Sequence, residues 1–271
     1  GQGNLHDGMG QGMAPGAKII ASWDHHTNGV RGTQNAHFFY RGYDGIPNTG
    51  DEADIASYSL TIIGNEGRNM GDYLTEFGST GNSGPFTHNI RKPNHVITVG
   101  AYTSLELENG GGTWGSPWQN SARGVSSNLE PNPHVVTVGH YHGGAEALNM
   151  GSYNGYMAYN RWHGTSLAAP IAAGIGALAM QAYNDEFGVN PTSTQLRDIL
   201  MSSAQDTGLD TYTQGGGFLD AKRAIDAIRG DNHAILVEPA ISTSITIPGE
   251  HSSEKFTLSN NGDKEVEVTV T

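Results

Sequence analysis

The sequence predicts an α/β fold in which a parallel β-sheet lies between layers of helices. Apolar stretches at residues 18–23, 96–99 and 135–138 have the length and composition of buried strands. Helical patterns alternate with these stretches, and such alternation is typical of a parallel sheet. A chain of 271 residues, 39 of them glycine, can bury a large core and still contain many loops.

Three helices are predicted from the spacing of apolar residues. Residues 167–183 are mainly Ala, Ile, Leu, Met and Gly with almost no charge, which predicts a helix that is apolar on every side and therefore buried. A Pro-Thr-Ser sequence at 191–193 is typical of a helix start, and a third helix is expected from residue 221. The apolar faces of these two helices consist of Leu196, Ile199 and Leu200, and of Ala221, Ala224, Ile225 and Ile228.

After residue 232 the helical pattern gives way to short alternating strands. We therefore expect a first domain over residues 1–232 and the start of a β-sandwich-like C-terminal segment over residues 233–271, which either begins an accessory domain or packs on the first one. Pro-Gly and Asn-Gly turns separate the strands. The alternating apolar positions are Ile241, Ile245, Ile247, Phe256, Leu258, Val266, Val268 and Val270.

Composition excludes several classes of function. The chain contains no cysteine, so disulfides and thiol chemistry contribute nothing. It has 27 acidic and 14 basic residues, and the net charge of −13 argues against nucleic-acid binding. No apolar run is expected to span a membrane, because the apolar residues 168–180 are assigned to a core helix.

Residues 164–170 (Gly-Thr-Ser-Leu-Ala-Ala-Pro) place a serine hydroxyl at the start of the buried helix. Gly164 allows a tight turn and leaves open space in front of Ser166. Unpaired amides and the positive end of the helix dipole favour an oxyanion at this place. A nucleophilic serine also needs a histidine base and an orienting carboxylate. The alternative is that Ser166 only caps the helix, since serine is a favoured N-cap residue.

Five segments, in order along the chain, resemble the subtilisin-like serine proteases, the subtilases. This resemblance implies a subtilisin-like fold and a serine endopeptidase that forms an acyl-enzyme on Ser166. It also implies that the Asn82 side-chain amide and the Ser166 backbone N–H hold the oxyanion. The matching segments are residues 12–19 (Gly-Met-Ala-Pro-Gly-Ala-Lys-Ile), 81–85 (Gly-Asn-Ser-Gly-Pro), 96–101 (Val-Ile-Thr-Val-Gly-Ala), 164–170 and 215–221 (Gly-Gly-Gly-Phe-Leu-Asp-Ala).

The resemblance also implies an extended protein or peptide substrate that pairs as an added strand beside one segment of the chain. Ser59-Leu60-Thr61 resembles that segment, with Thr61 in place of the family's glycine. A secreted protein, extracellular or on the cell surface, is expected by the same resemblance. The residues expected around the substrate are Ser59, Leu60, Thr61, Ser79, Thr80, Gly81 and Thr165, with room for a medium or large uncharged side chain.

The chain departs from the family in lacking both motifs that carry the other members of the triad. Neither an Asp-Thr-Gly or Asp-Ser-Gly strand end nor a His-Gly-Thr-His motif occurs in it. In subtilases these motifs lie upstream of the segment that begins this chain, so we expect an upstream or separate companion segment to supply the Asp and the His. The substitutes within the chain, His6, the Asp24-His25-His26 run and His163, are poorer candidates by position.

Two further alternatives concern the oxyanion and the activity. Gly64-Asn65-Glu66-Gly67 is a second string with an asparagine between glycines, but Asn82 stands at a more suitable distance before the strand at 96–99. A sedolisin-like peptidase fits less well, because that family stabilises the oxyanion with an aspartate. The alternative function is a catalytically inactive subtilase-fold protein that acts as a binding or scaffold module.

An acidic loop provides a candidate calcium site. Asp44, Asn48, Asp51 and Asp54 supply oxygen ligands of the kind that calcium prefers, and many subtilases carry structural calcium. A solvated acidic turn is the alternative. A bound calcium ion predicts a lower melting temperature in the presence of a chelator, and an unchanged melting temperature would reject the metal.

Overall fold

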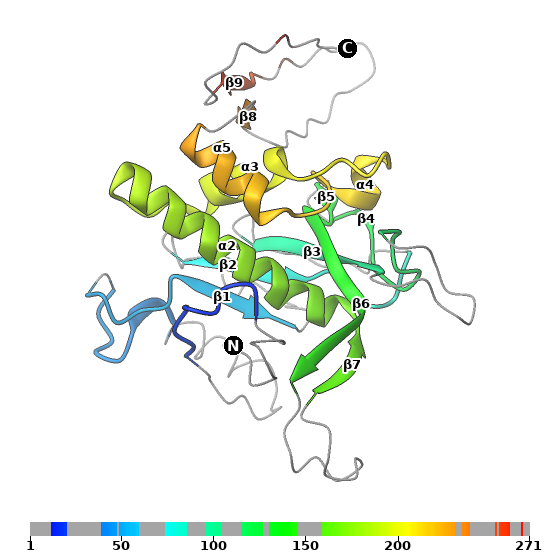
Figure 1. The fold of residues 1–271 in the computed structure, drawn as a ribbon, viewed down its shortest axis with the longest axis horizontal. Coiled ribbons are helices and arrows are strands. Elements are labelled where there is room, and N and C mark those ends of the chain that lie inside the picture. The colour runs from blue at the N-terminus through cyan, green and yellow to red at the C-terminus, as the bar shows by residue number, and fades with distance from the viewer. Residues whose placement is uncertain are drawn as a thin grey trace.

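The computed structural model describes residues 12–20, 39–47, 49–59, 74–85, 96–103, 115–126, 130–145, 159–230, 235–238, 253, 255–260 and 267. Its centre is a five-stranded sheet in the order β1-β2-β3-β6-β7 (Figure 1). The first four strands are parallel, and β7 runs antiparallel to β6. The strands are β1 (Ile55–Tyr58), β2 (Thr75–Ser79), β3 (Val96–Thr103), β6 (Val135–Ala145) and β7 (Tyr159–His163).

The central strands are buried along their length, as expected of a parallel sheet covered on both faces. Every residue of β2 and β3 is buried, and Phe77 on β2 lies opposite Ile97 on β3. The strands expected at 96–99 and 135–138 are confirmed, and both extend further than predicted. Residues 18–20 form no strand, and residues 21–23 lie outside the described part.

Helix α2 (Thr165–Phe187) lies across the sheet and forms the centre of the core (Figure 1). Its small residues allow the helix to approach the sheet closely. A Cβ atom on Gly176 would stand 2.5 Å from the Phe77 ring, so a larger residue does not fit there. Met13, in the segment before the sheet, reaches the same helix, because a Cβ atom on Gly174 would stand 2.8 Å from the Met13 Cβ.

One sequence-based expectation needs correction. At 23 residues, with a mean hydropathy of 1.3, α2 is long and apolar enough to cross a membrane by length and composition, contrary to the expectation of no such run. More than half of the residues in its apolar window are buried inside the protein. The helix therefore serves as a core helix in this fold, which agrees with its assignment from sequence.

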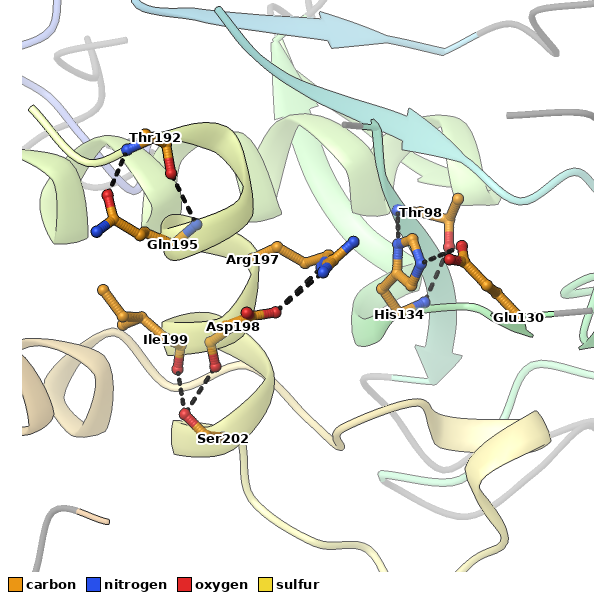
Figure 2. Close-up of polar contacts among 9 residues, drawn as sticks. All are labelled: Thr98, Glu130, His134, Thr192, Gln195, Arg197, Asp198, Ile199 and Ser202. Atoms are coloured by element: carbon orange, nitrogen blue, oxygen red, sulfur yellow. Dashed lines mark hydrogen bonds and ion pairs between the residues drawn. The ribbon is translucent and has the colours of Figure 1, made fainter. Parts of the chain in front are cut away.

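The remaining helices begin at the caps that the sequence indicates. They are α3 (Ser193–Ser203), α4 (Thr211–Gln214) and α5 (Ala221–Arg229). Thr192 and Gln195 form a reciprocal capping box at the start of α3 (Figure 2). Asp220 accepts the first amides of α5. Leu196, Ile199 and Leu200 are buried as predicted, and the apolar face of α5 packs against the same core.

Four short strands lie outside the central sheet. They are β4 (Gly124–Val125), β5 (Pro131–Asn132), β8 (Ile235–Glu238) and β9 (Thr257–Asn260). The pairs β4–β5 and β8–β9 are antiparallel. The second pair agrees with a change to β structure after residue 232, while the predicted apolar positions at 241–247, 266, 268 and 270 lie outside the described part. The division into two domains stays a prediction.

A buried polar group joins β3 to the loop before β6 (Figure 2). The Thr98 N–H donates to Nδ1 of His134 at 3.0 Å, and the His134 N–H donates to the Thr98 hydroxyl at 2.9 Å. Because Nδ1 accepts, the proton of the neutral ring is placed on Nε2, which lies 3.8 Å from the Glu130 carboxylate. The Nε2–H group of His134 beside the carboxylate, together with the Arg197 charge, lowers the pKa of Glu130 below its ordinary value of 4.5.

This lowered pKa predicts a loss of stability in acid. The unfolded Glu130 carboxyl binds its proton at a higher pH than the folded one, so its contribution is complete above about pH 4.5 and is lost as the pH falls through the lower folded value. Glu130→Gln should cost about 1 kcal/mol at neutral pH and make the acid loss shallower. Urea unfolding between neutral and acid pH measures both effects. Asp185→Asn, at an exposed position of α2, is the matched control, and an equal profile for both variants would contradict the prediction.

Candidate active site

Ser166 is the second residue of α2, which begins directly after β7. The turn between them is made by Gly164, whose φ of 139° is a conformation that other residues rarely adopt. The Gly164 N–H donates to the Gly139 carbonyl at 2.6 Å and so joins this turn to β6. Gly164 is also the N-cap residue, and it offers no side chain to the helix. The alternative in which Ser166 caps the helix is therefore wrong.

The Ser166 side chain meets the carboxyl end of β1. Its Oγ donates to the Ser59 carbonyl at 2.9 Å, and the Ser59 hydroxyl donates to the Ser166 carbonyl at 2.7 Å. This reciprocal pair joins residues 107 positions apart and fixes the end of β1 beside the first turn of α2. Ser59 thus stands where the substrate segment was predicted, while Leu60 and Thr61 lie outside the described residues.

Asn82 lies in the loop after β2 and contacts the residue just before Ser166. Its Oδ1 accepts from the Thr165 N–H at 2.9 Å and from the Thr165 hydroxyl at 2.8 Å. The Thr165 hydroxyl in turn accepts from the Gly81 N–H at 3.1 Å. Two donors on one oxygen fix the orientation of the amide, because the reverse orientation would place the NH₂ group against them. The Nδ2 donor of Asn82 is therefore available on the other side.

The Asn82 amide and the helix start lie near the same point of the Gly164 turn. A Cβ atom placed on Gly164 would lie 3.3 Å from Nδ2 of Asn82 and 3.7 Å from the backbone nitrogen of Ser166. Ser166 belongs to the first turn of α2, whose amides have no acceptor within the helix. An N–H group at a helix start, with the helix dipole behind it, favours a negatively charged oxygen.

Other predicted site residues are only partly located. Ser79 and Thr80 are buried at the end of β2, and Gly81 adopts a φ of 103°. Their predicted place at the primary substrate pocket is not tested by these positions. Asn82 contacts Thr165, the residue before Ser166. The competing Asn65 lies outside the described residues, and the choice between the two stays a prediction.

The described part of the chain does not bring a base to Ser166. The hydrogen bond from Ser166 Oγ goes to the Ser59 carbonyl, and no histidine among the described residues takes its place. His163 is exposed and stands three residues before Ser166, with its ring against two other aromatic rings rather than the hydroxyl. His6 and the histidines at 25–26 lie outside the described residues.

An aromatic cluster next to the nucleophile was not found by sequence reasoning. The His163 ring packs edge-on against Trp118 and His140, with centroids 5.9 and 5.8 Å away, and the latter two rings stack at 5.4 Å. Burial, and then the nearby His163, lower the pKa of His140. The three rings come from three separate segments, so no motif could have indicated the cluster.

The acidic loop is held together by its own hydrogen bonds. The Asp51 carboxylate accepts two backbone amides and the Thr49 hydroxyl, Asp44 accepts one backbone amide, and Asp54 accepts a side-chain amide. Among the described residues, no three acidic or histidine side chains surround one point as metal ligands would. These carboxylates do not fit a calcium site as they stand. Asn48 lies outside the described part, and the calcium site stays a prediction.

Comparison with known families identifies the family to which this chain belongs. The model of the subtilase family matches residues 1–218. The chain belongs to the subtilase family. Over 262 residues it is 26% identical to the extracellular basic protease of Dichelobacter nodosus. The aligned region covers 89% of this chain and 40% of that protein. A stretch of 73 residues is 37% identical to halolysin of Haloferax mediterranei. This stretch covers 27% of this chain and 13% of halolysin. The chain thus spans less than half the length of these relatives.

Solved structures of subtilisin-like proteases share the fold of this subtilase. A lanthipeptide protease matches with a TM-score of 0.54 at 19% identity, covering 74% of this chain and 66% of the other. The patellamide maturation protease PatA matches with a TM-score of 0.51 at 21% identity, covering 75% of this chain and 68% of the other. These likenesses confirm the predicted subtilisin-like α/β fold.

The buried Thr165 hydroxyl provides a test of how the site is held. Thr165→Val should cost about 1–3 kcal/mol, because the Gly81 N–H loses its acceptor and Asn82 loses a donor inside the protein. Urea unfolding measures the loss. Thr211→Val, at an exposed position on α4, is the matched control and should change stability by less than about 0.5 kcal/mol. Equal effects of the two substitutions would show that the buried hydroxyl is not the anchor.

Proposed function

We propose that this chain is the later part of the catalytic domain of a subtilase endopeptidase, which cleaves peptide bonds through an acyl-enzyme on Ser166. One observation carries the proposal: Asn82 Nδ2 and the Ser166 backbone nitrogen lie near one point of the Gly164 turn, 3.3 and 3.7 Å from the place that a Gly164 Cβ would take. Under the proposal, an oxyanion formed by attack of the Ser166 hydroxyl accepts hydrogen bonds from these two groups. Family membership adds support, since the family consists of serine peptidases.

The proposed reaction begins with a change of hydrogen bond at Ser166. The hydroxyl leaves the Ser59 carbonyl and passes its proton to a histidine as Oγ attacks the carbonyl carbon of the substrate. The carbonyl oxygen becomes an oxyanion that accepts from Asn82 and from the Ser166 N–H. Collapse of this intermediate breaks the C–N bond, and the leaving amine takes the proton from the histidine. Water then attacks the acyl carbon in the same geometry and regenerates the hydroxyl.

The histidine and its orienting aspartate belong to a companion segment under this proposal. The segment is either upstream in the same protein or a separate polypeptide. The support is that this sequence contains neither of the two motifs in which subtilases carry the aspartate and the histidine. The first listed relatives are more than twice as long as this chain, so their length leaves room for such a segment.

The proposed substrate is an extended protein or peptide chain lying beside the end of β1. In the described part of the chain β1 pairs with β2 on one edge, so its other edge can receive an added strand. We also propose that the protein is secreted, because relatives are named as extracellular proteases. The carbonyl and hydroxyl of Ser59 lie at the end of this edge, next to the nucleophile.

A fluorophosphonate probe tests the nucleophile and the oxyanion donors together. Ser166 in the native full-length protein should attack the phosphorus, displace fluoride and become labelled at this residue. Asn82→Ala should slow turnover of a peptide substrate by about 10²–10³, because the amide donor is lost. Asn82→Asp keeps an oxygen that Thr165 can bind, but it replaces the Nδ2 donor with an acceptor and adds a negative charge. This variant should therefore slow turnover at least as much as Asn82→Ala while keeping the contact with Thr165. Mass spectrometry locates the label, and steady-state kinetics gives the rates.

The exposed Asn184 on α2 provides the control, since Asn184→Ala should leave labelling and turnover unchanged. Undiminished turnover in both Asn82 variants would reject the oxyanion role. Absence of labelling in the native protein would reject the nucleophile. It would instead favour the alternative, an inactive subtilase-fold protein that binds or positions other proteins.

A further inference from the structure

The cluster of Trp118, His140 and His163 lies next to the nucleophile but takes no part in the steps described above. His163 pairs with His140 across β6 and β7, and only two residues separate it from Ser166. Trp118 comes from a different segment and is hydrogen bonded through its backbone N–H to Ala101 on β3. The cluster is therefore connected to both the sheet and the turn that presents the serine.

Within the cluster, His163 alone is exposed. Trp118 and His140 are 5% and 7% exposed, so they form a buried support for the His163 ring. The two edge-on contacts, at interplanar angles of 61° and 69°, hold this ring in one place although it faces solvent. Among the described residues, its contacts are with rings, and no hydrogen bond or ion pair involves its nitrogens. Because the side chain is exposed, a ligand from solvent can reach it.

The position of His163 relative to β1 indicates which part of a substrate would meet it. In the sheet order β1-β2-β3-β6-β7, the strands β1 and β7 lie at opposite edges (Figure 1). Ser59 at the end of β1 and His163 at the end of β7 both lie next to Ser166, the first through hydrogen bonds and the second along the chain. A peptide that pairs with β1 runs along that strand, and at the end of β1 it reaches Ser166 and the turn that follows His163.

We infer that His163, supported by Trp118 and His140, is a specificity-determining residue that binds the substrate residue following the scissile bond. It favours a side chain with an oxygen acceptor, such as Glu, Asp, Gln or Asn. An imidazole ring in either neutral tautomer carries one N–H donor, and the ring is held in place by its neighbours. An aliphatic side chain would cover this donor without pairing with it. The inference rests on the proposed endopeptidase activity at Ser166.

Partition of the acyl-enzyme between water and amino-acid amides tests this residue directly. An ester substrate forms the acyl-enzyme on Ser166 in the native full-length protein. The amine nitrogen of an added amide then attacks the acyl carbon, the bond to Ser166 Oγ breaks, and the amine proton returns to the serine by way of the base. Because this step is the reverse of peptide cleavage, the side chain of the amide occupies the place of the leaving residue. Glutamine amide, glutamic acid amide and leucine amide are compared as ratios of product.

The native enzyme should transfer to the glutamine and glutamic acid amides about threefold to tenfold faster than to the leucine amide. His163→Leu should remove the preference, and His163→Gln, which keeps a side-chain donor, should restore part of it. Trp118→Phe should weaken the preference by loosening the ring. Tyr212→Leu, at an exposed position on α4, is the control and should keep the native ratio.

The outcomes separate this inference from the proposed function. Labelling of Ser166 by the fluorophosphonate probe together with an unchanged ratio in His163→Leu would overturn the role of His163 and leave the nucleophile in place. A native preference for the leucine amide would overturn it as well. Failure of Ser166 to label would reject the proposed function, and the inference would fall with it.

Discussion

The site depends on the buried hydroxyl of Thr165. This hydroxyl accepts from Gly81 and donates to Asn82, so it joins the loop after β2 to the first turn of α2. Its side chain is inaccessible to solvent, and an unpaired polar group there would cost about 1–3 kcal/mol. The amide of Asn82 therefore has one stable orientation. The same contact sets the position of Ser166, because the two residues are consecutive in one helical turn.

The close packing of α2 on the sheet explains why Thr165 and Asn82 are held in fixed positions. Small residues let α2 lie directly on the sheet, and at Gly176 no Cβ atom could fit beside Phe77. A densely packed helix has little freedom to shift. Its first turn therefore holds Ser166, the proposed nucleophile, and its backbone N–H at fixed places. The end of β1 is tied to the same turn through the reciprocal contacts between Ser59 and Ser166.

Sequence alone could predict the parts of the fold and the site that depend on neighbouring residues. The turn at Gly164 and the buried helix after it follow from short contiguous motifs. Strand β2 is not among the predicted strands, because its Glu76 is buried with a partner, Tyr58, that lies 18 residues away. The ring cluster around His163 was missed for the same reason: its members meet only after the sheet has formed.

The proposed mechanism divides between this chain and the proposed companion segment. The proposed nucleophile and oxyanion donors are held by contacts between residues 59, 81–82 and 164–166, all within this chain. The proton acceptor is not part of that set. Oxyanion stabilisation and substrate binding retain about 10³–10⁴-fold acceleration in serine proteases that lack a triad member. Under the proposal, the described residues thus supply the electrostatic part of the mechanism, and the companion segment supplies the part that moves the proton.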